Sequence, residues 1–263
     1  MLRRAIVRAP AATFADGLTT ADLGRPETGR ALEEHAAYCR ALEQCSLSVL
    51  RLPADPLNPD STFVEDTAVV VPGGVVLTRP GAPSRAGEVE AIRRLLQGRR
   101  LRVRAIEPPG TLDGGDVCEA GTGFFIGISR RTNEEGARQF GALLAEAGCR
   151  AAFVDVRGLP GILHLKSGLA WLGGRRLVVW DSLAGRAEFG GWDVLRVEPD
   201  EHYAANCLRV NDTVLVAAGF PGLEASLRGL GYNVLPLDMS EFRKMDGGLS
   251  CLSLRFETDP WEE

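Results

Sequence analysis

The stretch VEDTAVVVPGGVVLTRPG, residues 64–81, contains two runs of β-branched residues separated by a proline and two glycines. Runs of this composition on either side of a glycine turn predict a β-hairpin. The next stretch, SRAGEVEAIRRLLQG at residues 84–98, has apolar residues at helical spacing and ends on a glycine, which predicts a helix. Residues 64–98 therefore predict one unit of two strands followed by a helix.

Similar units recur along the chain. Paired apolar runs separated by short polar or glycine turns lie at residues 114–132, 163–180 and 207–219. Helical patterns follow the first and third of these pairs, at residues 133–148 and 221–231. After the second pair the helical pattern is weak. The chain therefore repeats the strand, strand, helix unit.

The two ends of the chain carry the same kinds of element. Residues 4–10 predict a strand, 29–45 a long amphipathic helix and 46–55 another strand, while 232–256 predict a strand, a short helix and a closing strand. A unit repeated about every 40 to 50 residues favours modules around an axis over an open α/β sheet, because doubly wound sheets lack hairpins inside each unit. With no low-complexity linker, residues 1–263 are predicted to form a single domain.

The composition is that of a soluble globular protein, with 45% hydrophobic and 25% charged residues. A net charge of -5 argues against a nucleic-acid partner, and no apolar stretch has the length of a membrane span. The first residues lack the apolar run of a secretory signal, so a cytoplasmic monomer or homodimer is expected. The six cysteines form no CxxC pair and the three histidines are dispersed, so we expect reduced thiols and neither metal nor cofactor.

Acidic clusters precede two of the predicted strands. PDSTFVEDTAVV places Asp60, Glu65 and Asp66 ahead of a β-branched run, and LDGGDV places Asp113 and Asp116 around a glycine pair. The first cluster is either a solvated strand start or a negatively charged pocket for a cationic substrate. The second is either an ordinary turn or a point where glycines let a ligand approach closely.

A cysteine and a histidine from distant parts of the chain are candidates for a nucleophile and its base. Cys251 lies in DGGLSCLSLRF and His164 in ILHLKSG, with Lys166 two residues after the histidine. Free cysteine is among the most buried residue types, and a lone histidine in an apolar stretch is more often a core residue than a catalyst. The residues alone leave both a core and a catalytic interpretation open.

Arginines stand where two predicted strands give way to helices. Arg85 ends TRPGAPSR, and Arg130 and Arg131 lie in GISRRTNEEG. Most arginines solvate a surface, but an arginine at a strand–helix junction is well placed to bind a carboxylate through two parallel hydrogen bonds. These arginines are therefore candidates for binding an acidic group of a substrate.

Taken in order, the motifs FVED, TRPGAPSR, LDGGDV, SRRTN, ILHLKS and DGGLSC resemble those of the dimethylarginine dimethylaminohydrolase family, a group of guanidine-modifying enzymes. The resemblance runs from the amino-terminal loop through Cys251, which is nearly the whole chain. It implies a five-bladed α/β propeller of ββαβ modules with pseudo-fivefold symmetry, forming one catalytic domain. That fold agrees with the repeated unit predicted from the hydrophobic pattern.

The resemblance also implies roles for individual residues. Cys251 matches the family's nucleophile, His164 its general acid/base, and Asp113 the carboxylate that orients and charges the site. The substrate-binding positions that it implies are Asp66 for the guanidinium, with Glu65 and Asp60 in the same pocket, Arg85 and Arg131 for the carboxylate, the Leu18 carbonyl for the α-amine under a mobile lid, and Asp246 near the reacting nitrogen.

The activity implied by the resemblance is hydrolysis of asymmetric dimethylarginine and monomethylarginine to citrulline and di- or monomethylamine, with no cofactor. Cys251 would attack the guanidinium carbon, His164 would protonate the departing amine, and water would release the product from a covalent thiouronium. Because nearby carboxylates oppose a thiolate, Cys251 is expected to be activated mainly when the cationic substrate arrives.

Other guanidine-modifying enzymes are the nearest alternatives. Arginine deiminases carry His-x-Asp, whereas Lys166 stands at the second of those positions here. Agmatine deiminases act on a substrate with no carboxylate for Arg85 and Arg131 to bind. Amidinotransferases, which need a second amine site, stay open. A non-catalytic protein that binds arginine-like ligands would be expected to lose the nucleophile, which this chain keeps.

Overall fold

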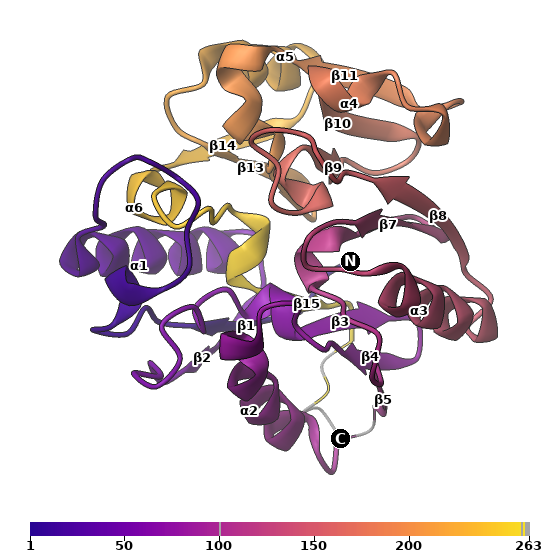
Figure 1. The fold of residues 1–263 in the computed structure, drawn as a ribbon. Helices are drawn as coiled ribbons and strands as arrows, with labels where there is room; N and C mark the ends of the chain where they lie inside the picture. Colours follow the sequence, from indigo (N-terminus) through magenta and orange to yellow (C-terminus); the bar gives the residue numbers. More distant parts are fainter. Residues whose placement is uncertain (100, 259, 261–263) are drawn as a thin grey trace.

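The computed structural model describes residues 1–99, 101–258 and 260, and the strands in these ranges form five separate three-stranded sheets (Figure 1). In each sheet the middle strand pairs antiparallel with one neighbour and parallel with the other. In spatial order the sheets are β15 (Leu254–Phe256), β1 (Arg4–Arg8) and β2 (Ser48–Leu52); β3 (Ala68–Val71), β4 (Gly74–Leu77) and β5 (Arg102–Ala105); β6 (Val117–Ala120), β7 (Gly123–Ile128) and β8 (Arg150–Asp155); β9 (Leu169–Trp171), β10 (Arg176–Trp180) and β11 (Asp193–Val197); and β12 (Leu208–Val210), β13 (Thr213–Ala217) and β14 (Asn233–Leu237).

A helix connects the two parallel strands of every sheet, because strands that run in the same direction need a crossover. These helices are α1 (Thr28–Gln44), α2 (Ala86–Leu96), α3 (Glu134–Glu146), α4 (Asp181–Ala184) and α5 (Pro221–Gly229), and α6 (Ser240–Arg243) precedes the closing strand. The predicted hairpins are confirmed, and the weak helical pattern after 163–180 corresponds to the single turn of α4. None of the helices in the described part of the chain is long and apolar enough to cross a membrane.

The first and last strands of the chain belong to one sheet. Strand β1 pairs parallel with β2 and antiparallel with β15, with Arg4 opposite Phe256. The sequence predicted each of these strands, but local pattern does not indicate which strands pair across the length of the chain. The final sheet is therefore completed only when the two ends of the chain meet.

The strands are buried on both faces, since alternate residues of a strand point to opposite sides of its sheet. In β4, Val75 and Leu77 enter an apolar cluster with the sheet of β1, whereas Val76 enters a cluster with the sheet of β7. Strands β7, β10, β13 and β1 divide their residues between two clusters in the same way. The apolar clusters of the described residues thus join each sheet to two others in a closed series, which explains the continuous apolar runs in the sequence.

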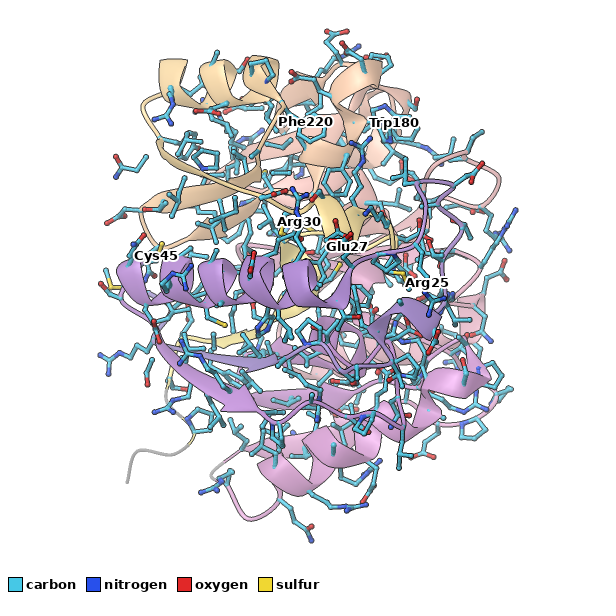
Figure 2. All side chains as sticks on the ribbon, turned by 90° about the vertical axis from the view of Figure 1, so that its left-hand side faces the viewer. Arg25, Glu27, Arg30, Cys45, Trp180 and Phe220 are labelled. Carbon is cyan, nitrogen blue, oxygen red and sulfur yellow. The ribbon has the colours of Figure 1, made fainter. Side chains whose placement is uncertain are left out.

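Helices α1 and α6 cap one another. Figure 2 shows α1 crossing one side of the molecule, with Glu27 and Arg30 at its start. The N–H of Glu27 donates to Oε2 of Glu241 in α6 over 2.7 Å, and the N–H of Glu241 in turn donates to the carboxylate of Glu34 in α1. Helix starts present N–H groups that need such acceptors. This reciprocal arrangement fixes the segment that leads from α6 to β15.

Candidate active site

One small cavity collects most of the residues that the sequence singled out. All of the predicted site residues except Asp113 and Glu65 line it. The lining consists of Leu18, Asp60, Phe63, Asp66, Arg85, Arg131, Leu163, His164, Met245, Asp246, Gly247 and Cys251. Phe63 and Gly247 were missed although they stand beside predicted residues in FVED and DGGLSC, and nothing in the sequence indicated Leu163 or Met245.

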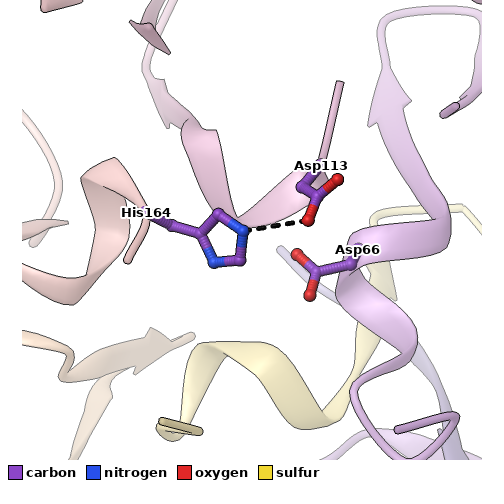
Figure 3. Close-up of side chains that lie close together, drawn as sticks. All are labelled: Asp66, Asp113 and His164. Carbon is purple, nitrogen blue, oxygen red and sulfur yellow. Dashed lines mark hydrogen bonds and ion pairs between the residues drawn. The ribbon is translucent and has the colours of Figure 1, made fainter. Parts of the chain in front are cut away.

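His164 and Asp113 form a hydrogen-bonded pair (Figure 3). Nε2 of His164 lies 3.0 Å from Oδ2 of Asp113, which is fully buried. The other oxygen of Asp113 accepts the N–H of Gly81 over 2.8 Å, and the N–H of Leu165 donates to Asp116 over 2.9 Å, which holds the turn after the histidine. A carboxylate bonded to a histidine fixes the ring's orientation and tautomer and stabilises its charged form. Asp113 therefore acts on the cavity through His164.

The two glycines of LDGGDV permit this close packing. A Cβ atom on Gly115 would lie 2.7 Å from Nδ1 of His164 and 2.9 Å from Oδ1 of Asp66, and one on Gly114 would overlap the carbonyl oxygen of Glu65. Real Cβ contacts are not this short, so neither position has room for a side chain. The sequence left a turn or a ligand approach open, and in the structure the glycines face other side chains and backbone of the site.

Asp66 is held beside the histidine by Arg85. Nη1 of Arg85 donates to Oδ2 of Asp66 over 2.6 Å, and the N–H of Gly115 donates to Oδ1 over 2.8 Å. Arg85 also makes two parallel hydrogen bonds to Glu88, of 3.0 Å from Nε and 2.7 Å from Nη2. A guanidinium offers five N–H groups in total. These two acids take most of them, so only part of Arg85 remains for a ligand.

Arg131 is the freer of the two predicted arginines. Its Nη1 atom is buried and has no hydrogen-bond partner among the residues that the structure describes. It forms only a long ion pair with Asp113, in which Nη1 lies 3.8 Å from Oδ2. Buried N–H groups are normally satisfied by a partner, a water or a ligand. Arg131 is therefore the stronger candidate for binding a carboxylate in the cavity.

Asp66, Asp113 and His164 are the one group in the described chain whose side chains could together hold a metal ion (Figure 3). Their ligand atoms all lie within 4.8 Å of one another. Each carboxylate already has a partner, because Asp113 bonds to the histidine and Asp66 to Arg85. A protonated imidazole between two carboxylates accounts for the same arrangement without an ion.

Cys251 lies in a 3₁₀ turn, Ser250–Leu252, at the cavity. Four of the six cysteines are buried, whereas Cys251 is partly exposed. The glycines before it are required by packing, because a Cβ atom on Gly248 would lie 2.6 Å from Cγ of Asn206. Asp246 adopts a positive φ of 56°, which non-glycine residues do rarely. This placement favours the nucleophile over the core interpretation of Cys251.

The charges around the cavity favour a protonated histidine and a neutral thiol. Burial opposes an imidazolium at His164, but Asp66 and Asp113 outweigh it and raise the pKa of His164 to about 9. Burial also acts to raise the pKa of Asp66, yet His164 and Arg85 hold that pKa well below its usual range. Burial and the nearby carboxylates raise the pKa of the Cys251 thiol to about 12. At neutral pH the resting site therefore holds an imidazolium, carboxylates and a thiol.

Alkylation of Cys251 by iodoacetamide in the resting protein is expected to be slow at pH 7 and to quicken about tenfold per pH unit between about pH 6 and 8, since only the thiolate reacts. The unfolded protein is expected to react faster, because a free cysteine has a lower pKa. Timed labelling and mass spectrometry of the peptide that contains Cys251 measure both rates. A rate in the folded protein that does not change over this range would mean an ionised thiol and contradict the charge arrangement.

The loop before α1 is fastened to two acids of the site. Both oxygens of Asp60 accept the N–H of Leu18, over 3.0 and 3.1 Å. Oδ2 of Asp246 accepts the N–H and the hydroxyl of Thr20, over 2.5 and 3.0 Å. The prediction for Leu18 concerned its carbonyl, whereas these bonds use its N–H. Thr20 was missed, and FADGLTT offers no local signal that it would contact residue 246.

Glu65 is not among the described residues that line the cavity. Its carboxylate lies 2.6 Å from Nζ of Lys166 and accepts the hydroxyl of Ser250 over 2.9 Å. Successive residues of the tight turn Val64–Thr67 point in different directions, so Asp66 faces the cavity while Glu65 faces the protein interior. The expectation that Glu65 shares the substrate pocket is not met in this structure.

Comparison with curated proteins finds relatives along the whole chain. The sequence matches no protein-family model. It is 43% identical over 259 residues to N(G),N(G)-dimethylarginine dimethylaminohydrolase of Pseudomonas aeruginosa, which covers 97% of this chain and 100% of the relative. It is 34% identical over 255 residues to the Streptomyces coelicolor protein of the same name, which covers 96% of each.

Solved structures agree in fold. The P. aeruginosa protein as a cysteine-to-serine mutant complexed with citrulline superimposes with a TM-score of 0.93 at 42% identity, covering 97% of this chain and 100% of the other. A histidine-to-glycine variant of dimethylarginine dimethylaminohydrolase, an adduct with S-methyl-L-thiocitrulline, gives the same values. The N-terminal domain of the arginine dihydrolase ArgZ, at 19% identity and a TM-score of 0.85, covers 96% of this chain and shares its fold.

Proposed function

The chain belongs to the dimethylarginine dimethylaminohydrolase family, and on that premise we propose that it hydrolyses Nω-methylated arginines to citrulline and di- or monomethylamine. The observation that carries the proposal is one cavity lined by Cys251, His164 and Asp66, with Asp113 bonded to the histidine. A thiol, an acid–base group and a carboxylate are what cleavage of a cationic guanidinium requires. Citrulline and thiocitrulline complexes of the relatives support the same substrate class.

The guanidinium binds beside Asp66, whose charge is maintained at neutral pH by its neighbours. A bound cation also favours the thiolate of Cys251, which then loses its proton to solvent as the substrate enters. The sulfur attacks the guanidinium carbon, and the bond from this carbon to the methylated nitrogen breaks. The imidazolium of His164 gives its proton to that nitrogen, and di- or monomethylamine leaves.

The covalent thiouronium is then hydrolysed by the same histidine in its neutral form. His164 takes a proton from water as the oxygen bonds to the carbon, which restores the imidazolium. The carbon–sulfur bond breaks, and citrulline departs as Cys251 recovers its proton. Asp113 keeps the ring in the orientation that serves both steps, since it is bonded to Nε2 throughout.

The amino-acid end of the substrate lies toward Arg131 and Arg85 in this proposal. Arg131 has the unsatisfied Nη1 group, and Arg85 adds the remainder of its donors. Asp60 and the Leu18 carbonyl take the α-amine, and Asp246 lies near the reacting nitrogen. All five residues line the same cavity, which supports a single binding site for both ends of one arginine.

The fold that accompanies this function is, we infer, a five-bladed α/β propeller with pseudo-fivefold symmetry in one domain of residues 1–263. The closed series of apolar clusters between the five sheets supports it. The turns Val64–Thr67, Leu165–Ser167 and Ser250–Leu252 come from three different sheet units and supply neighbouring parts of the site. A ring of modules brings such turns to a common centre.

The proposal is tested by supplying asymmetric dimethylarginine, monomethylarginine, arginine and agmatine separately and measuring the ureido product and the released amine. Citrulline is expected from the two methylated arginines, with dimethylamine and methylamine respectively. Agmatine is expected to react poorly because it has no carboxylate for Arg131. Turnover of arginine with a kcat/KM equal to that of the methylated substrates would make the protein a deiminase and contradict the proposal.

A further inference from the structure

Glu65 is a buried acid next to Asp66 in sequence, yet it meets two other turns of the site rather than the cavity. Its side chain is 5% exposed, and its partners are Lys166, Ser250 and Arg255. Buried charges require such partners, because an unpaired carboxylate is costly to remove from water. Each partner belongs to, or contacts, a turn that carries a catalytic residue of the proposed reaction.

The first link reaches the nucleophile's turn. Oε2 of Glu65 accepts the hydroxyl of Ser250, the residue before Cys251, over 2.9 Å. Arg255 lies 3.1 Å from Oε1 of Glu65 and donates from Nη1 to the carbonyl of Ser250, also over 3.1 Å. The N–H of Ser250 donates to Asn206. The residue before the nucleophile is therefore held at its N–H, hydroxyl and carbonyl.

The second link reaches the histidine's turn. Nζ of Lys166 lies 2.6 Å from Oε1 of Glu65, and the lysine side chain is only 13% exposed. Lys166 is part of the turn Leu165–Ser167 that His164 caps, with hydrogen bonds in both directions between His164 and Ser167. One carboxylate thus fastens the turn after the histidine to the turn that contains the cysteine.

We propose that Glu65 and Lys166 are positioning residues that fix His164 and Cys251 relative to each other, and that Glu65 does not bind the substrate. The inference rests on the proposed function for the identity of the reacting groups. Acid–base transfer and nucleophilic attack both depend on such placement, and supporting side chains hold reacting groups to within fractions of an ångström. A substrate ligand would instead face the cavity, as Asp66 does.

The pair also has a signature at the thiol. Glu65 acts to raise the pKa of Cys251 and Lys166 acts to lower it. The other titratable groups that face Cys251 are Asp66, His164, Asp246 and Tyr203. Removing the lysine and removing the glutamate should therefore shift the ionisation of the thiol in opposite directions, although both variants lose the same link.

The experiment compares Lys166→Met, Lys166→Arg and Glu65→Gln with the full-length wild type. Lys166→Met and Glu65→Gln are expected to lower kcat for dimethylarginine at least about tenfold while KM changes less than about twofold, because the reacting groups are misplaced and the binding groups are not. Lys166→Arg keeps a cation opposite Glu65 and is expected to recover most of the activity. Arg104→Met, which removes an exposed ion pair with Glu146, is the control for losing a cation elsewhere.

The second readout is the pH dependence of Cys251 alkylation without substrate. Lys166→Met is expected to shift the curve to higher pH and Glu65→Gln to lower pH. A KM that rises tenfold in Glu65→Gln with kcat retained would make Glu65 a substrate ligand and overturn the proposal. Curves that do not move, or that move in the same direction, would also overturn it. If Glu65→Gln does not fold, Lys166→Met against Lys166→Arg carries the test.

The two proposals fail separately. A wild type that releases no citrulline from any methylated arginine would end the proposed function, whereas opposite shifts of the alkylation curves would still support the link between the two turns. Normal turnover by the wild type with unchanged kcat in Lys166→Met would retain the function and overturn the positioning role.

Discussion

Replacing Cys251 with serine is expected to reduce kcat for dimethylarginine by about 10⁴-fold or more, because the loss of a nucleophile removes the covalent route altogether. A serine hydroxyl is a far weaker nucleophile than a thiol beside an imidazolium with a pKa of about 9, and the site holds no second base to activate it among the described lining residues. The side chain differs by one atom, so binding of citrulline is expected to remain near that of the wild type.

The measurement is steady-state release of citrulline together with calorimetric binding of citrulline to the variant. Cys149→Ser is the matched control, since Cys149 is the other partly exposed cysteine and lies outside the cavity lining. It is expected to retain activity. A Cys251→Ser variant with more than a few per cent of wild-type turnover would mean that the sulfur is not the nucleophile.

Replacing Asp113 with asparagine is expected to lower kcat by about 10² to 10⁴-fold with little change in KM, because an amide no longer stabilises the charged ring of His164. The pKa of His164 is expected to fall as well, since Asp113 is among the groups that raise it. The acid limb of the kcat profile therefore weakens first above neutral pH, where the wild-type ring remains protonated up to about pH 9.

A substrate with a different leaving group isolates this effect. S-Methyl-L-thiocitrulline releases a thiol, which needs less help from a proton donor than an amine does, so the first step is expected to be less impaired by Asp113→Asn than it is with dimethylarginine. Asp181→Asn, at an exposed ion pair with Arg196, serves as the control. Equal losses with both substrates would show that Asp113 acts on folding or binding rather than on proton transfer.

Local pattern predicted most of the secondary structure. Alternating apolar runs around glycine turns became the hairpins β3–β4 and β6–β7, and helical spacing became α1, α2 and α3. It also predicted strands that are buried on both faces, because their apolar runs are nearly continuous. What it did not give was the pairing of β1 with β15, since that contact joins residues about as far apart in sequence as the chain allows.

The candidate site divides in a similar way. Cys251, His164 and Asp66 could be selected from motifs, because each chemical role requires a particular residue type. The partners of these residues were not visible in the motifs: Glu88 occupies much of Arg85, and Thr20 meets Asp246.

The sequence by itself therefore determined the repeating unit, the chemical groups available for the reaction and the family. The tertiary structure alone decided that Glu65 turns away from Asp66 and bonds Lys166 and Ser250. The physical reason is that residue type and local periodicity are set within a few neighbours, whereas the direction of a side chain in a tight turn depends on which distant segments pack against it.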